Sequence, residues 1–221
     1  MPSLSRSLFL PLALIGATTL GACSHEGNIE LANDSIGLKI TRSACPAVGI
    51  PAYTGDETLF TTPGGRTAND IDVVAEIVNV TPQCADTGTG PLTSSVSFTV
   101  EGRRTSASGA RDVTLPYFAT AIRGGTQVVS KQLGRVGLHF ADGQLRATTS
   151  GTATVTIDRS AVALSQKVRN RLTRKRKATD ADASIDPMTD PEIRSEVSRA
   201  SFELLVGFQL SNDQLAYNAT R

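Results

Sequence analysis

A strict alternation of apolar and polar residues is the feature that most constrains how this chain can fold. Over residues 94–100, Val96, Phe98 and Val100 fall on one face, while serine and threonine residues fall on the other. Such alternation is typical of a β-strand that buries one face and exposes the other. The sequence therefore predicts a sheet packed over an apolar core.

The same pattern recurs between residues 35 and 158. Further strands are predicted over residues 71–77, 111–122 and 136–140, and one or two more over residues 145–157, across Gly151. Val78 and Val80 break the register of the first of these segments, which indicates a β-bulge. Pro116 has no amide proton to donate, so its strand should lie at a sheet edge or be kinked.

Glycine-containing turns separate the predicted strands. Among Ser108-Gly109, Gly124-Gly125 and Asp142-Gly143, the last gives the strongest hairpin signal. Six or seven short antiparallel strands at this spacing favour a β-sandwich of immunoglobulin or fibronectin type, with a barrel as the second choice. We therefore expect a mainly β fold, with residues 35–221 forming a single sandwich domain.

Residues 161–200 differ from the rest and predict a two-helix insertion. Leu164, Val168 and Leu172 recur every four residues, which predicts an apolar stripe that docks the first helix on the sandwich. The Thr-Asp-Pro-Glu sequence of residues 189–192 predicts that the second helix starts through a capping box. In that helix the residues expected to face inward are Ile193, Val197 and Ala200.

Two elements are predicted after the insertion. Residues 202–210 alternate again, which indicates a late strand that returns to the sandwich. Ser211 and Gln214 have the spacing of a capping box, so a last short helix should begin there.

The N-terminal residues predict a targeting segment. Residues 8–19 are apolar but too few to span a bilayer as a helix, and Leu20-Gly21-Ala22-Cys23 follows them. This pattern resembles the lipobox of bacterial lipoproteins; the alternative is an ordinary signal peptide with a cysteine near its cleavage point. The resemblance implies that residues 1–22 are removed as a signal peptide and that Cys23 is acylated.

The resemblance also implies a location. Residues 23–34 are small and polar, and predict a short tether between the lipid and the folded body. By the sorting tendency of lipobox proteins, Ser24 implies the periplasmic face of the outer membrane. The lipid bilayer is then one partner of the chain, and its body resembles the uncharacterised β-sandwich lipoproteins of Gram-negative envelopes.

Cysteine usage fits an oxidising compartment. With Cys23 acylated, Cys45 and Cys84 form an even pair, and a disulfide between them is expected. It would stabilise the fold by up to about 4 kcal/mol on the chain-entropy model. The alternatives are two free thiols or a metal site, and the latter is disfavoured because no histidine lies nearby.

A basic run is the most visible cluster of charge. Seven cations and no acid stand within eleven residues: Lys167, Arg169, Arg171, Arg174, Lys175, Arg176 and Lys177. The run is a candidate surface for an anionic partner, such as anionic lipid or lipopolysaccharide. The alternative is a helix end that is stabilised by the helix dipole and neutralised by Asp180, Asp182, Asp186 and Asp190.

The sequence predicts no metal and no cofactor. Residues 180–186 place oxygen side chains at alternate positions, as a calcium loop does. However, Ile185 stands where the loop needs glycine, and Pro191 stands where it needs a glutamate. We therefore expect an exposed acidic loop.

Candidate catalytic residues are few. The two histidines are His25, in the predicted tether, and His139, which should point outward from its strand. No nucleophile elbow, zinc pair or phosphate loop is present in the sequence. Tyr53, Tyr117 and Phe118 are interpreted either as part of a surface groove or as core packing with a hydrogen-bonded tyrosine.

These observations favour a non-enzymatic interaction or structural module that binds another envelope protein. The chain has 22 basic and 21 acidic residues, so no overall charge directs it to nucleic acid. The alternative is a ligand-binding domain for envelope glycans or lipids, followed by a hydrolase whose carboxylates the sequence does not reveal.

Overall fold

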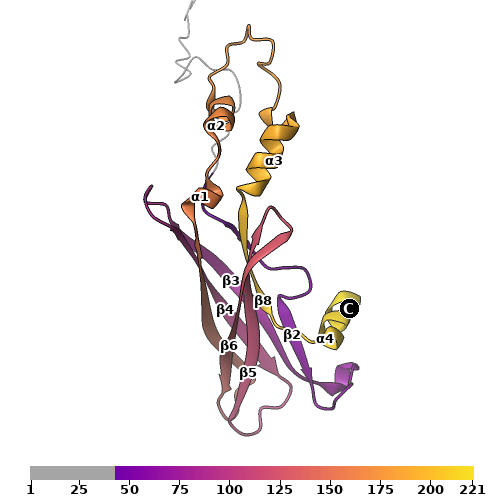
Figure 1. The fold of residues 1–221 in the computed structure, drawn as a ribbon. Coiled ribbons are helices and arrows are strands. Elements are labelled where there is room, and N and C mark those ends of the chain that lie inside the picture. The colour runs from indigo at the N-terminus through magenta and orange to yellow at the C-terminus, as the bar shows by residue number, and fades with distance from the viewer. Residues whose placement is uncertain (1–42) are drawn as a thin grey trace, which may run out of the picture.

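The structure is a computed structural model that describes residues 43–221. Two four-stranded sheets face each other in a sandwich-like arrangement (Figure 1). The first sheet has the strand order β1 (Ala47–Gly49), β8 (Phe202–Phe208), β5 (Arg111–Arg123) and β6 (Gln127–Phe140). The second sheet has the order β2 (Asp56–Phe60), β3 (Ile71–Ala85), β4 (Leu92–Arg104) and β7 (Arg146–Ile157). All neighbours are antiparallel except β1 and β8. The mainly β, antiparallel prediction is confirmed.

The alternating residues supply the core. Val96, Phe98 and Val100 of β4 are buried, as are Leu138 and Phe140 of β6, so the two sheets pack through the predicted faces. The Phe98 ring lies over Gly151 of β7, where a Cβ atom would come within 2.3 Å of the ring. A side chain at position 151 is therefore excluded by the packing of the core.

Two irregularities fall where the sequence predicted them. The register between β3 and β4 shifts between Val78 and Thr81, and Asn79 has a positive φ of 52°, so the predicted bulge is confirmed. Pro116 lies in β5 directly before Tyr117, where pairing with β8 begins. Over Arg111–Pro116 the ladder of β5 is with β6 alone, although the Pro116 carbonyl accepts a hydrogen bond from the Gln209 amide at 2.9 Å just beyond β8. β5 as a whole is an interior strand, so the prediction that the proline places its strand at an edge holds only for this end.

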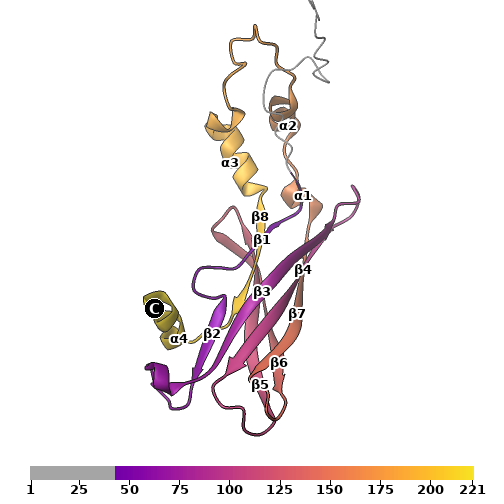
Figure 2. The same ribbon diagram turned by 180° about the vertical axis from the view of Figure 1, so that it is seen from behind.

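The helices α1 (Arg159–Val162), α2 (Gln166–Thr173) and α3 (Pro191–Arg199) lie between β7 and β8. α2 and α3 form a helical hairpin that projects beyond the end of the sandwich where the described chain begins (Figures 1 and 2). Val168 and Leu172 pack with Ile193 in a small core separate from that of the sheets. The predicted docking of the first helix on the sandwich is therefore wrong, because α3 covers the apolar stripe instead.

The start of α3 also differs from the prediction by one residue. Its N-cap is Asp190, whose side chain accepts a hydrogen bond from the Glu192 amide, while Thr189 ends a short 3₁₀ turn, η2 (Pro187–Thr189). Aspartate and threonine both cap helices, and Pro191 at the first helical position fixes the start after Asp190.

The C-terminal helix α4 (Asn212–Thr220) has the predicted Ser211–Gln214 capping box. It lies beside β2 and is attached largely through polar groups. Gln214 Nε2 donates to Glu57 Oε1 at 2.8 Å, and Asn218 Nδ2 donates to the carbonyls of Tyr53 and Asp56 at 2.9 and 2.8 Å. Another 3₁₀ turn, η1 (Ala68–Asp70), precedes β3.

Candidate functional site

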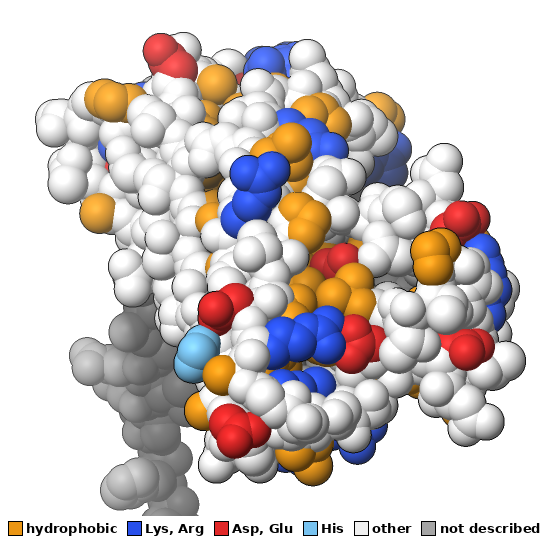
Figure 3. Space-filling model, turned by 90° about the horizontal axis from the view of Figure 1, so that it is seen from below, with side chains coloured by type: hydrophobic (Ala, Val, Ile, Leu, Met, Phe, Trp, Pro, Cys, Tyr) orange, Lys and Arg blue, Asp and Glu red, His pale blue; other side chains and the backbone are white. Residues whose placement is uncertain are grey.

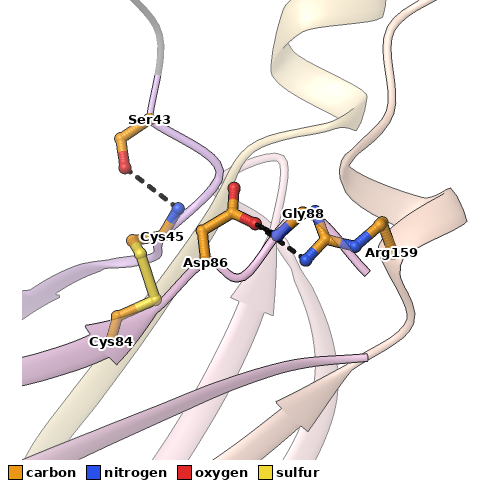
Figure 4. Close-up of a disulfide and its surroundings, with 6 residues drawn as sticks. All are labelled: Ser43, Cys45, Cys84, Asp86, Gly88 and Arg159. Carbon is orange, nitrogen blue, oxygen red and sulfur yellow. Dashed lines mark hydrogen bonds and ion pairs between the residues drawn. A yellow bond between two sulfur atoms is a disulfide. The ribbon is translucent and has the colours of Figure 1, made fainter. Parts of the chain in front are cut away.

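The predicted disulfide is present at the end of the sandwich next to the helices. Cys45 and Cys84 are bonded, with their Cα atoms 5.9 Å apart (Figure 4). Near them, the Asp86 carboxylate accepts from the Gly88 amide at 3.0 Å and pairs with Arg159 at 2.7 Å. The hydrogen bond from Arg159 is the main reason that the pKa of Asp86 lies below its usual range. Together these contacts tie the chain before β1, the end of β3 and the start of α1 to one another.

Carboxylates from α3 and its preceding loop pair with much of the basic run. Lys167 pairs with Glu192 at 2.7 Å, and Arg171 pairs with Asp190 at 2.8 Å. Arg174 forms an ion pair with Asp182. Further along, Arg176 donates to the Asp182 and Ile185 carbonyls, and Arg169 donates to Gln166. These cations thus lie among acids and backbone acceptors, as expected if the run is a neutralised helix end.

The acidic loop uses its carboxylates for different local purposes. Asp180 accepts from the Lys177 amide, Asp182 pairs with Arg174, and Asp186 accepts from the Met188 amide at the start of η2. Within residues 43–221 no group of three or more histidine, cysteine, aspartate or glutamate side chains is arranged to hold a metal ion. The carboxylates of the loop are thus used locally, on Arg174 and on two backbone amides.

The aromatic residues singled out in the sequence do not form one groove. Tyr117 and Phe118 are consecutive in β5 and so point to opposite faces of the sheet. Tyr117 packs edge-on against Phe98 and donates its hydroxyl to the Thr152 carbonyl at 2.9 Å, in agreement with the packing interpretation. His139 points outward, and its Nδ1 lies 2.7 Å from Asp112.

A strand edge that the sequence did not reveal is the most distinctive surface of the sandwich. β6 is the last strand of its sheet, and no other described strand pairs with its outer side. Residues 127–135 of β6 are exposed except for the half-buried Ser130 and Gly134. Three large apolar side chains are exposed there, namely Val128 at 59%, Val129 at 44% and Leu133 at 69%. Unpaired backbone groups and exposed apolar side chains together are the features of a strand that can accept a partner.

The neighbouring edge, β7, is covered differently. Tyr117 donates to the Thr152 carbonyl, and Gln132 Nε2 donates to the Thr154 carbonyl at 3.1 Å. Side chains of the first sheet thus occupy hydrogen-bonding groups on the edge of the second. The described part of β6 has one irregularity of its own, a bulge at Val129 between the pairs Ile122–Val128 and Ala121–Ser130. We therefore take residues 127–135, which we call the β6 edge, as the candidate interaction site.

Sequence reasoning missed the β6 edge for a physical reason. Only residues 136–140 of the strand bury one face, and only there do apolar residues alternate. The available signals were the Gly124-Gly125 turn and the β-branched pair Val128-Val129 that follows it.

A cleft of about 470 Å³ lies between α4 and the loop after β2. Its lining includes Phe60, Thr62, Arg66, Gln214 and Tyr217. Phe60 and Tyr217 pack edge-on with ring centroids 5.1 Å apart. The lining combines aromatic rings, hydroxyls and an ion pair between Arg66 and Asp213 at 3.3 Å, and is suited to a small polar ligand.

The end of the sandwich opposite the helices shows no patch made of one kind of side chain. There, cationic, anionic and apolar side chains are interspersed (Figure 3). Among the described residues, no helix has both the length and the apolar character needed to cross a membrane. Comparison with protein-family models, with curated proteins and with solved structures found no match to this chain.

Proposed function

We propose that this protein is a lipid-anchored lipoprotein of the bacterial envelope whose folded domain is a non-enzymatic interaction module. The β6 edge carries this proposal, because a strand with an unpaired side and exposed apolar residues is suited to pairing with an extended segment of another protein. Such pairing needs no catalytic group and no cofactor.

The lipid anchor rests on Leu20-Gly21-Ala22-Cys23, which lie outside the described residues. The Cys45–Cys84 disulfide supports export to an oxidising compartment such as the periplasm. Mass spectrometry of membrane-extracted protein should show an N-terminus at Cys23 that carries acyl chains. A Cys23→Ser variant that is processed normally and remains equally membrane-bound would contradict the anchor.

We infer further that the sandwich is of fibronectin-like type. One sheet contains β3–β4–β7 and the other β6–β5–β8, and the chain crosses between them from β4 to β5, from β6 to β7 and from β7 to β8. This agrees with the arrangement of strands A, B, E and C′, C, F in that class. The position next to β8, where a final strand would lie, is occupied by β1, which runs parallel to β8.

A photo-crosslinking amino acid placed at position 133 of the full-length protein tests the β6 edge in cells. We expect one discrete protein adduct from position 133 and none from position 145. Leu145 is the matched control because it is also an exposed leucine, at 46%, but precedes β7. Equal labelling from both positions, or no discrete adduct from position 133, would exclude the β6 edge as the binding surface.

A ligand-binding domain for glycans or lipids is the second candidate function, and the cleft beside α4 favours it. The basic run remains a candidate for anionic lipid or lipopolysaccharide, since the helical hairpin projects from the end where the described chain begins. Co-sedimentation with anionic vesicles tests the latter. Loss of binding in Arg174→Glu/Lys175→Glu/Arg176→Glu supports it, whereas equal binding by the variant and the wild type, or no binding by either at low salt, argues against it.

A further inference from the structure

We propose that the β6 edge binds an extended segment of a partner protein that carries acidic residues four positions apart. The inference rests on the proposed function and names the chemistry of the partner. Its basis is the side-chain pattern of residues 131–135, taken together with the unpaired side of the strand.

Side chains on one face of the β6 edge follow the order cation, apolar residue, cation. Lys131, Leu133 and Arg135 occupy alternate positions, so they share a face of the sheet. Lys131 lies with its Nζ 5.5 Å from the centre of the Phe118 ring, which helps to hold it above that face. Leu133, the residue between the cations, is opposite Phe118 in the ladder.

The charge of β6 is of one sign. Residues 127–140 contain the cations Lys131 and Arg135 and no acid. Residues directly opposite each other on neighbouring strands point to the same face, where opposite charges attract and like charges repel. A strand added beside β6 is therefore favoured when it places carboxylates opposite Lys131 and Arg135 and an apolar residue opposite Leu133.

A second copy of this chain fits the β6 edge poorly. Antiparallel pairing of two copies about Leu133 would place Lys131 of one copy opposite Arg135 of its partner, twice by symmetry. Like charges directly opposite each other are destabilising, and lysine on an edge strand is a known means of discouraging pairing between identical strands. An acidic segment is free of this repulsion.

Two fluorescent peptides test the proposal with the full-length protein in detergent. The acidic probe is Thr-Glu-Thr-Val-Thr-Glu-Thr, and the basic probe replaces both glutamates with lysine. We expect the acidic probe to bind roughly tenfold more tightly by fluorescence anisotropy, because two cross-strand charge pairs change from attractive to repulsive between the probes. An acidic probe with proline at the residue before valine should bind weakly, since proline removes a backbone donor and disfavours the strand.

A charge-reversed variant sharpens the test. Lys131→Glu/Arg135→Glu should prefer the basic probe, which loss of folding cannot produce. The matched control is Arg103→Glu/Arg146→Glu, which reverses two exposed cations opposite each other on the other sheet and should keep the preference for the acidic probe. Equal affinity for both probes, no measurable binding, or an unchanged preference in the β6 variant would overturn the proposal.

Two further results separate the related ideas. Glu26, Glu30 and Asp34 of this chain also stand four residues apart. If Glu30→Lys/Asp34→Lys raises the affinity of the full-length protein for the acidic probe, its own segment competes with the probe for the β6 edge, which supports the acidic chemistry of the ligand. If crosslinks from position 133 persist but neither probe binds, the interaction module stands and the acidic partner is wrong.

Discussion

The sandwich and the helical hairpin are stabilised by different interactions. The sheets enclose a continuous apolar core that includes Phe98, Phe140 and Phe208, and a disulfide fastens one end. The hairpin buries Val168, Leu172 and Ile193 and otherwise relies on exposed ion pairs. Apolar burial contributes about 25 cal/mol per Å², whereas an exposed ion pair contributes at most about 1 kcal/mol. The sandwich is therefore the scaffold, and the hairpin is the region expected to open locally.

The largest effect is expected from the centre of the sandwich. Phe98→Ala should lower the free energy of unfolding by about 3–5 kcal/mol, because it leaves a cavity between Gly151 and Tyr117. Urea denaturation measures this loss. Phe60→Ala is the control at the half-buried edge and should cost clearly less; equal losses would mean that the core is not centred on Phe98.

Removal of the disulfide should have the next largest effect. Cys45→Ser/Cys84→Ser frees a loop with a sequence separation of 39, which should cost about 2–4 kcal/mol. Thermal unfolding of the double variant, compared with the oxidised wild-type protein, measures this loss, and the reduced wild type should behave like the variant. Unchanged stability would show that the disulfide does not restrain the unfolded chain as expected.

Segments with one buried face could be predicted from the sequence, whereas exposed segments and the partner of each apolar face could not. The strands over residues 94–100 and 136–140 were predictable because burial of one face imposes alternation on the sequence. The β6 edge was not, since its exposed faces impose no such pattern. The stripe of Leu164, Val168 and Leu172 showed which side of α2 is apolar, but not that α3 rather than a sheet covers it.

Ile193→Ala should distinguish the hairpin from the sandwich. Ile193 is buried between α2 and α3, so its truncation should speed amide hydrogen exchange in those helices while protection in β4 and β5 is unchanged. The global free energy of unfolding should fall by less than about 1 kcal/mol, because the sandwich unfolds separately. Ile157→Ala, a buried isoleucine of β7, is the matched control and should lower it by about 2–5 kcal/mol.

Glu57 should give the sandwich a pH dependence opposite in sign to that of the hairpin, where hydrogen bonds lower the pKa values of Asp190 and Glu196. Burial raises the pKa of the Glu57 carboxyl, the hydrogen bond from Gln214 partly offsets this, and Oε2 has no partner among the described residues. Because the pKa is higher in the folded state, the stability from Glu57 is complete below the ordinary value of 4.5 and is lost as the pH rises through the folded value. Glu57→Gln should weaken the dependence of the thermal unfolding midpoint on pH above the ordinary value of 4.5. A dependence on pH equal to that of the wild type would exclude Glu57 as its source.

The smallest effect is expected from the ion pairs of the hairpin. Arg174 and Asp182 are both about half exposed, at 51% and 46%, so water and salt screen their attraction. Arg174→Ala and Asp182→Ala should each change the free energy of unfolding by less than about 1 kcal/mol, and a double-mutant cycle should give a coupling of the same order that falls in high salt. A coupling well above this, or one insensitive to salt, would mean that the loop of residues 174–190 is ordered by its charges. The hairpin would then be a fixed part of the scaffold, and the contrast between the two regions would fail at its weakest point.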